Sequence, residues 1–246
     1  MFETLRTARA VMRSLGVYYG RGSRSAEKDQ LYAQFIKPGD LVFDVGAHVG
    51  DRVASFRRLG ARVVAVESQP ALAFTLKTIY GRDPEVTIER KAVGRNPGTI
   101  EMKINLDNPT VSTASGAFID AAKDAQGWEG QAWEKTIIVP VTTLDALIAA
   151  HGVPAFVKID VEGFEAEVLA GLTRAIAALS FEFTTIQRDV ARSCIARCVT
   201  LGFQRYNAAL GESQQLGEWR SAEDIERWLM ALPHAANSGD IYARLA

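Results

Sequence analysis

The sequence lacks the cysteine content that marks disulfide-rich and zinc-binding proteins. Its 246 residues include only 2 cysteines, Cys194 and Cys198, spaced four apart. No second pair exists to complete a metal site, and one pair cannot form a disulfide framework. We expect both thiols to be reduced and buried in a helix, which suits a cytoplasmic protein.

Charge of one sign and long hydrophobic runs are also lacking. The chain has 28 Lys plus Arg against 29 Asp plus Glu, a net charge of -1, so we expect no nucleic-acid partner. No segment approaches the ~18 apolar residues of a membrane span. Arginines at 6, 9 and 13 interrupt the first apolar residues, unlike a secretory signal. We therefore predict a cytoplasmic protein with no transmembrane segment.

Residues 1–30 are predicted to form a helix and a linker that precede the main domain. One apolar helical stripe is expected from the spacing of Phe2, Leu5, Ala8, Met12 and Leu15. This helix would pack on the main domain or on a second subunit, as in a homodimer; contact with a membrane surface is a weaker alternative. Residues 20–30 are polar and contain Gly and Ser, which favours a linker.

From residue 31 to 246 the pattern indicates one α/β domain. With 48% hydrophobic residues the chain can fill a continuous core. Short apolar segments alternate with helical ones, which is typical of a mostly parallel sheet with helices on both faces. An insertion interrupts the alternation at about 98–141. The seven predicted strands are 41–45, 62–66, 86–90, 155–159, 179–184, 203–208 and 241–245, and the main helices are 49–58, 70–80, 142–151, 163–172 and 188–201.

The first predicted strand leads into a glycine-containing turn, DVGAHVG, at residues 44–50. Ligands of open parallel sheets bind at such strand ends. Gly46 and Gly50 are four apart, unlike the GxGxxG of dinucleotide sites, and Asp44 would repel a pyrophosphate. Glu67 ends the second strand, where a carboxylate can accept hydrogen bonds from both hydroxyls of a ribose. The pattern indicates a nucleoside ligand with positive charge.

Four segments together resemble a known family. LVFDVGAHVGDRV, VVAVESQP, ERKAVG and FVKIDVEGFEAEVLAGL resemble, in order and spacing, the motifs of FkbM-type methyltransferases over about residues 37–184. The resemblance implies a class I methyltransferase Rossmann-like fold with a seven-stranded sheet, S-adenosylmethionine as cofactor, and methylation of hydroxyl groups. His48 stands where the family usually has Asn, and both can hydrogen-bond the cofactor. The implied cofactor residues are Asp44, Gly46, Ala47, His48, Gly50, Glu67, Ser68, Ala92, Val93 and Asp160.

A second acidic group follows the fourth main strand. Transfer of a methyl group to an alcohol requires a group that orients the oxygen and accepts its proton. Asp160 is our first candidate, and Glu162 and Glu182 complete the predicted catalytic set. Lys158 is costly to bury unless a carboxylate pairs with it. The three acids could hold Mg²⁺, but sequence spacing does not tell whether they meet at one point, and we predict no metal.

The insertion is the predicted source of acceptor choice. Its polar and aromatic residues, which suit a sugar ring, are Asn108, Ser112, Thr113, Trp128 and Trp133. Tryptophans can equally anchor a long loop. We expect an O-methyltransferase acting on a hydroxyl of a sugar, polysaccharide or small secondary metabolite. The alternatives are an NAD-dependent oxidoreductase on the same architecture, or a catalytically idle cofactor-binding scaffold in glycan assembly.

Overall fold

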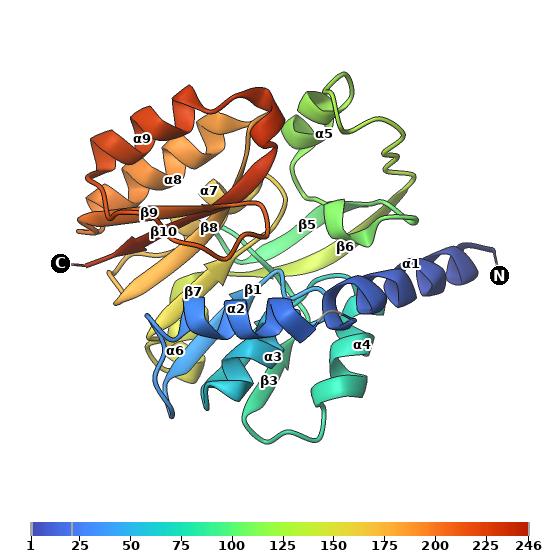
Figure 1. Cartoon of the computed structure of the whole chain (residues 1–246). Helices are drawn as coiled ribbons and strands as arrows, with labels where there is room; N and C mark the ends of the chain where they lie inside the picture. Colours follow the sequence, from blue (N-terminus) through green and yellow to red (C-terminus); the bar gives the residue numbers. More distant parts are fainter. Residues whose placement is uncertain (1, 21, 246) are drawn as a thin grey trace.

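The computed structural model describes residues 2–20 and 22–245. Its central sheet has seven strands in the order β3-β2-β1-β7-β8-β10-β9 (Figure 1). The pairings among β3, β2, β1, β7 and β8 are parallel, and β10 is antiparallel to both of its neighbours, β8 and β9. This is the predicted class I methyltransferase arrangement. The strands are β1 (Leu41–Val45), β2 (Arg62–Val66), β3 (Val86–Glu89), β7 (Phe156–Ile159), β8 (Ala178–Thr184), β9 (Arg205–Leu210) and β10 (Ser238–Arg244).

Helices cover both faces of the sheet, because alternate strand residues supply apolar side chains to each face. In β1, Val42 packs towards α2 (Gly22–Tyr32), α3 and α4, whereas Phe43 and Val45 pack towards α6, α7, α8 and α9. The order of strands reverses between β1 and β7, which places a crevice at their carboxyl ends. The helices are α3 (Asp51–Arg58), α4 (Pro70–Tyr80), α6 (Leu144–His151), α7 (Glu165–Ala170), α8 (Arg188–Thr200) and α9 (Ala222–Ala231).

The segment predicted as an insertion forms a small second sheet. Strands β4 (Ala92–Val93), β5 (Gly98–Ile104) and β6 (Lys135–Thr142) pair in the order β4-β6-β5, and η1 (Pro109–Val111) and α5 (Gly116–Ala122) lie between β5 and β6. Trp128 packs edge-on against Phe118, with ring centroids 5.1 Å apart. Trp133 donates a hydrogen bond to the carbonyl of Val111. Both tryptophans therefore anchor the long connection.

The N-terminal region differs from its prediction in two ways. Most of the expected linker is helix α2 (Gly22–Tyr32), because Leu31 and Tyr32 are buried and dock it on α3. Helix α1 (Phe2–Tyr19) packs on its own chain, but Leu5 and Met12 of the predicted stripe are 57% and 67% exposed. Its buried face carries Ala10 and Val11 instead. No helix among the described residues is long and apolar enough to cross a membrane.

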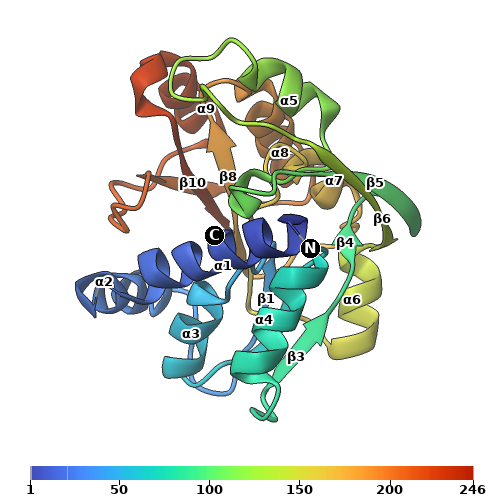
Figure 2. The same cartoon turned by 90° about the vertical axis from the view of Figure 1, so that its right-hand side faces the viewer.

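Helix α1 bridges the first turn and the insertion (Figure 2). At its carboxyl end the hydroxyl of Tyr19 donates to the carbonyl of Val49, 2.9 Å away, beside Tyr80. Near its other end Arg6 forms ion pairs with Asp107 and Glu134 of the insertion. One helix thus holds together two parts of the chain that are far apart in sequence.

Gly46 allows the turn after β1 to approach β7. Its φ is +84°, and a Cβ there would overlap the carbonyl oxygen of Asp160. Gly39 has a similar φ of +87°, but a Cβ there would meet nothing within 4 Å.

These two glycines provide a matched test. Gly39→Ala should lower the free energy of unfolding by about 1 to 2 kcal/mol, the cost of a left-handed non-glycine residue. Gly46→Ala should lower it by about 3 to 5 kcal/mol, because overlap with the backbone adds to that strain. Urea denaturation of both variants measures the difference. Equal losses would show that the approach of the two strands is not what requires glycine at position 46.

Candidate functional site

A pocket lies at the carboxyl ends of β1, β2 and β7, where the strand order reverses. The open space within it, including its mouth, is about 910 Å³. The turn after β1 and the ends of β2 and β7 form its base. Tyr18 of α1, and Thr110, Ser112 and Ala114 of the insertion, complete its wall.

Most of the predicted site residues meet in this pocket, but three do not line it. Asp44 is 1% exposed and lies beneath the turn, opposite Lys158 in the β1–β7 register. A Cβ at Gly50 would meet Leu76 and Tyr80, so this glycine serves the packing of α4. Glu182 borders a small neighbouring cavity. The residues in the pocket wall are Gly46, Ala47, His48, Glu67, Ser68, Ala92, Val93, Asp160 and Glu162.

Glu67 joins the two strand-end turns. It is 4% exposed, and its carboxylate accepts the backbone N–H groups of His48 at 2.9 Å and Gln69 at 2.7 Å. Each oxygen keeps a second lone pair for a ligand in the pocket. Burial raises the pKa of Glu67 to about 7, although these hydrogen bonds oppose the shift. The carboxylate is therefore rigidly held where a ribose could reach it.

His48 connects the turn to the roof of the pocket. Its φ is +50°, in the left-handed region. Its ring lies edge-on to Tyr18, with centroids 5.5 Å apart, and its Nε2 is 3.4 Å from Oγ1 of Thr110. Burial lowers the pKa of His48, so the imidazole is neutral at pH 7 and can both donate and accept a hydrogen bond.

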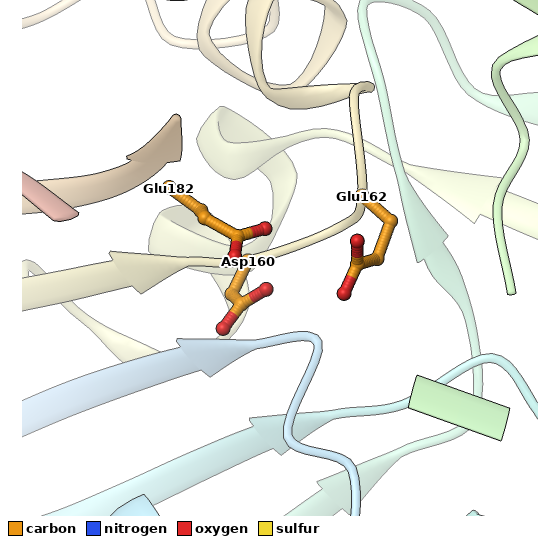
Figure 3. Close-up of side chains that lie close together, drawn as sticks. All are labelled: Asp160, Glu162 and Glu182. Atoms are coloured by element: carbon orange, nitrogen blue, oxygen red, sulfur yellow. The ribbon is translucent and has the colours of Figure 1, made fainter. Parts of the chain in front are cut away.

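Three acidic side chains converge at the opposite end of the site (Figure 3). Asp160 and Glu162 follow β7, and Glu182 comes from β8. One carboxylate oxygen of each lies within 4.8 Å of the others. The structure thus brings together all three residues of the predicted catalytic set.

A buried lysine divides this cluster into different charge states. Lys158, 2% exposed, donates to Asp160 Oδ2 at 2.5 Å, which confirms the expected ion pair. Burial alone would raise the pKa of Asp160, but Lys158 outweighs it, and the pKa lies below the ordinary value. Burial and then the charge of Asp160 raise the pKa of Glu162 and Glu182 well above theirs. Asp160 is therefore ionised, while the glutamic acids favour their protonated forms.

Glu165 positions the loop that carries this cluster. Its Oε1 accepts the backbone N–H groups of Val161 at 3.0 Å and Gly163 at 3.2 Å. The side chain is 2% exposed, and burial raises its pKa from 4.5 to about 7 despite these bonds. Glu165 acts on the site through the backbone.

Sequence reasoning missed Tyr18, Arg52 and Glu212 in the pocket wall. Arg52 is 8% exposed and pairs with Asp51 at 2.8 Å and Glu212 at 3.0 Å. The available signal was its position, since a basic residue in the first turn of a helix opposes the macrodipole and needs a partner. No local signal marks Tyr18 or Glu212, because the fold alone brings them to the pocket.

The charges of the wall fit a cationic ligand. Glu162 is 7% exposed, and none of the hydrogen bonds among the described residues involves its carboxylate. A cationic ligand would favour the ionised forms of Glu67 and Glu162, whose pKa values burial raises. The acidic side chains of the wall are Asp51, Glu67, Asp160, Glu162 and Glu212, and the basic ones are Arg52, Lys91 and Lys158. These groups suit S-adenosylmethionine, which carries an ammonium and a sulfonium.

The raised pKa of Glu165 predicts a specific pH dependence of stability. Between about pH 4.5 and 7 the folded protein keeps a proton on this carboxyl that the unfolded chain releases, so stability falls as the pH rises. Relative to Glu165→Gln, which keeps an oxygen acceptor but cannot ionise, the original protein should lose on the order of 3 kcal/mol between pH 4 and 8. Urea denaturation at several pH values measures this difference.

Glu167→Gln is the control. Glu167 lies in the same helix as Glu165, but it is exposed and forms an ion pair with Arg95. It should leave the pH profile of the original protein unchanged. A parallel profile for Glu165→Gln would show that Glu165 ionises normally in the folded state.

Comparison with known structures finds distant neighbours. A precorrin-6y C5,15-methyltransferase from Geobacter metallireducens is 12% identical, covers 91% of this chain and 87% of its own, and has a TM-score of 0.43. A TehB-like SAM-dependent methyltransferase from Corynebacterium glutamicum has 13% identity, 89% and 88% coverage, and a TM-score of 0.45. Magnesium protoporphyrin IX methyltransferase from Synechocystis is 11% identical, covers 96% of this chain and 84% of its own, and has a TM-score of 0.46. At these scores the likenesses carry no functional argument.

No curated protein matches the sequence significantly. The methyltransferase FkbM domain model, by contrast, matches residues 44–236, most of the chain. This range includes the turn after β1, Glu67, the insertion and the acidic cluster, and it confirms the family that the motifs indicate. The nicotinamide-dependent oxidoreductase alternative has no such support. The chain belongs to the FkbM family and is an S-adenosylmethionine-dependent methyltransferase.

Proposed function

We propose that the enzyme methylates a hydroxyl group of a sugar, a polysaccharide or a small secondary metabolite. The observation that carries the proposal is that an ionised Asp160 and a buried Glu162 line the same pocket wall as Glu67. The carboxyl group of Glu162 makes no hydrogen bond to the described residues. One end of this pocket suits a nucleoside, and the other end suits a hydroxyl group.

The cofactor would lie along the carboxyl ends of β2, β1 and β7. Glu67 has free lone pairs for the ribose hydroxyls, and Ala92 and Val93 offer an apolar wall for the adenine. The backbone of residues 46–48 would face the methionine part. Asp44, buried under the turn, would act by its charge and not by contact.

The bound cofactor supplies an electrophilic methyl group. The residues of the chain must hold the acceptor oxygen in line with it and remove a proton. Asp160 is ionised, so it can accept a hydrogen bond from the hydroxyl and then its proton. A protonated Glu162 can donate to a second oxygen of the acceptor. Together they would bind neighbouring hydroxyls.

The insertion supports a hydroxylated acceptor. Thr110 and Ser112 line the pocket and can each donate and accept hydrogen bonds. Trp128 and Trp133 lie outside the wall, which favours the anchoring interpretation over stacking on a sugar ring. Both cysteines are free and buried, which fits action in the reducing cytoplasm.

Glu67→Gln tests the cofactor site, with Glu89→Gln as its matched control. Both residues end strands, but Glu89 pairs with Lys91 and His151 instead of lining the pocket. We expect Glu67→Gln to weaken S-adenosylmethionine binding at least about tenfold, because a charged hydrogen-bond acceptor is lost. Glu89→Gln should change it less than about twofold. Calorimetric titration measures both, and absence of heat with the folded original protein would refute the cofactor assignment.

Asp160→Asn tests the acceptor end. We expect turnover to fall by about 10²-fold or more while cofactor affinity changes little, as for loss of a general base. The assay is transfer of labelled methyl from the cofactor to extracts, sugars and polysaccharides. Asp120→Asn, on the exposed side of α5, is the control and should keep full activity. Equal turnover in both variants would exclude Asp160 as the base, and no transfer to any acceptor would favour the idle scaffold.

A further inference from the structure

The geometry of the acidic cluster matches the needs of a metal ion. Oxygen ligands lie about 2.0 to 2.6 Å from Mg²⁺, Ca²⁺ and divalent ions of intermediate size such as Mn²⁺. Two oxygens on opposite sides of such an ion are therefore about 4 to 5 Å apart. One oxygen each of Asp160, Glu162 and Glu182 lies within 4.8 Å of the others. The carboxyl groups of Glu162 and Glu182 point towards Asp160 from different elements (Figure 3).

Independent of this spacing, three carboxyl groups at this end have an oxygen without a hydrogen-bond partner in the described part of the chain: Glu162, Asp240 and Glu182, whose Oε2 is enclosed. Glu162 is 93% buried, and no hydrogen bond among the described residues satisfies its carboxylate, although it points into the cluster. Asp240, opposite Glu182 in the β8–β10 pairing, is 92% buried and has an enclosed, unbonded Oδ1. Buried polar groups normally find hydrogen-bond partners. Their absence indicates that something else satisfies this end of the site.

The net charge selects the kind of ligand. A bound cation would release the protons of Glu162 and Glu182. The three carboxylates then carry three negative charges, and Lys158 neutralises one through Asp160. Two negative charges are left, which a divalent cation balances. Asp160 and Glu182 are partly exposed, so the remaining ligand positions are open to water or to an oxygen of the acceptor.

We propose that Asp160, Glu162 and Glu182 bind a divalent cation, Mg²⁺ or Mn²⁺, beside the cofactor. Resting on the proposed function, the cation would take the acceptor hydroxyl as a ligand and hold its oxygen near the methyl group. Sequence spacing alone gave no reason to bring these residues to one point, and we therefore expected no metal. The fold does so by placing β7 and β8 side by side.

Binding of Mn²⁺ to the full chain, freed of metals with EDTA, tests the site. Electron paramagnetic resonance titration should show one bound ion per chain, with and without S-adenosylmethionine. Glu162→Gln and Glu182→Gln should each weaken binding at least about tenfold, as expected for loss of a ligand. Glu167→Gln, at the exposed pair with Arg95, should leave it unchanged. No bound Mn²⁺ at millimolar concentration, or equal binding by all variants, would overturn the proposal.

A second measurement uses the unaltered protein and does not depend on the folding of any variant. With cofactor labelled with ¹³C at the methyl group, bound Mn²⁺ should strongly broaden the methyl resonance, and Mg²⁺ should not. If Mn²⁺ binds but the methyl resonance is not broadened, the ion lies elsewhere and the proposal is refuted. Displacement of Mn²⁺ by the cofactor would also refute it. If Mn²⁺ fails to bind but the cofactor binds, only the cation proposal fails. If the cofactor fails to bind, the proposed function fails, and the titration without cofactor still decides the cation site.

Discussion

The ion pair between Lys158 and Asp160 determines the chemistry of the pocket. Lys158 is only 2% exposed, and a buried ammonium group is costly unless a negative charge lies close to it. The pair keeps Asp160 ionised, and the charge of Asp160 then disfavours ionisation of Glu162 and Glu182. One lysine in an apolar strand therefore creates two kinds of carboxyl group within a few ångströms.

The sheet and its main helices could be predicted because their signals are local. The central strands β1, β2, β7 and β8 are short, mostly apolar segments, and the predicted helix at 70–80 matches α4. Helix α2 was missed because it is mostly polar and its docking depends on Leu31 and Tyr32 at its end. The stripe assigned to α1 was wrong because contacts with α4 and the insertion decide its buried face.

The candidate site was predictable only where a residue lies at a strand end. Glu67 and Asp160 occupy such ends, and both line the pocket. Asp44 lies one position before the end of β1, and strand alternation directs it to the face shared with Val42, so it does not line the pocket. Tyr18 and Glu212 reach the pocket through the path of the chain, which no local pattern encodes. The meeting of Glu182 with Asp160 depends in the same way on strand order.

The bridge made by α1 constrains how this enzyme could diverge. Arg6 forms ion pairs with Asp107 and Glu134 of the insertion. At the other end of α1 the hydroxyl of Tyr19 donates to the carbonyl of Val49 in the turn after β1. A change in the insertion that admits a new acceptor must also keep or replace the ion pairs that hold α1 to the insertion. Among relatives that accept different substrates, the N-terminal helix and the insertion should therefore vary together, while the strands beneath them keep their own pattern.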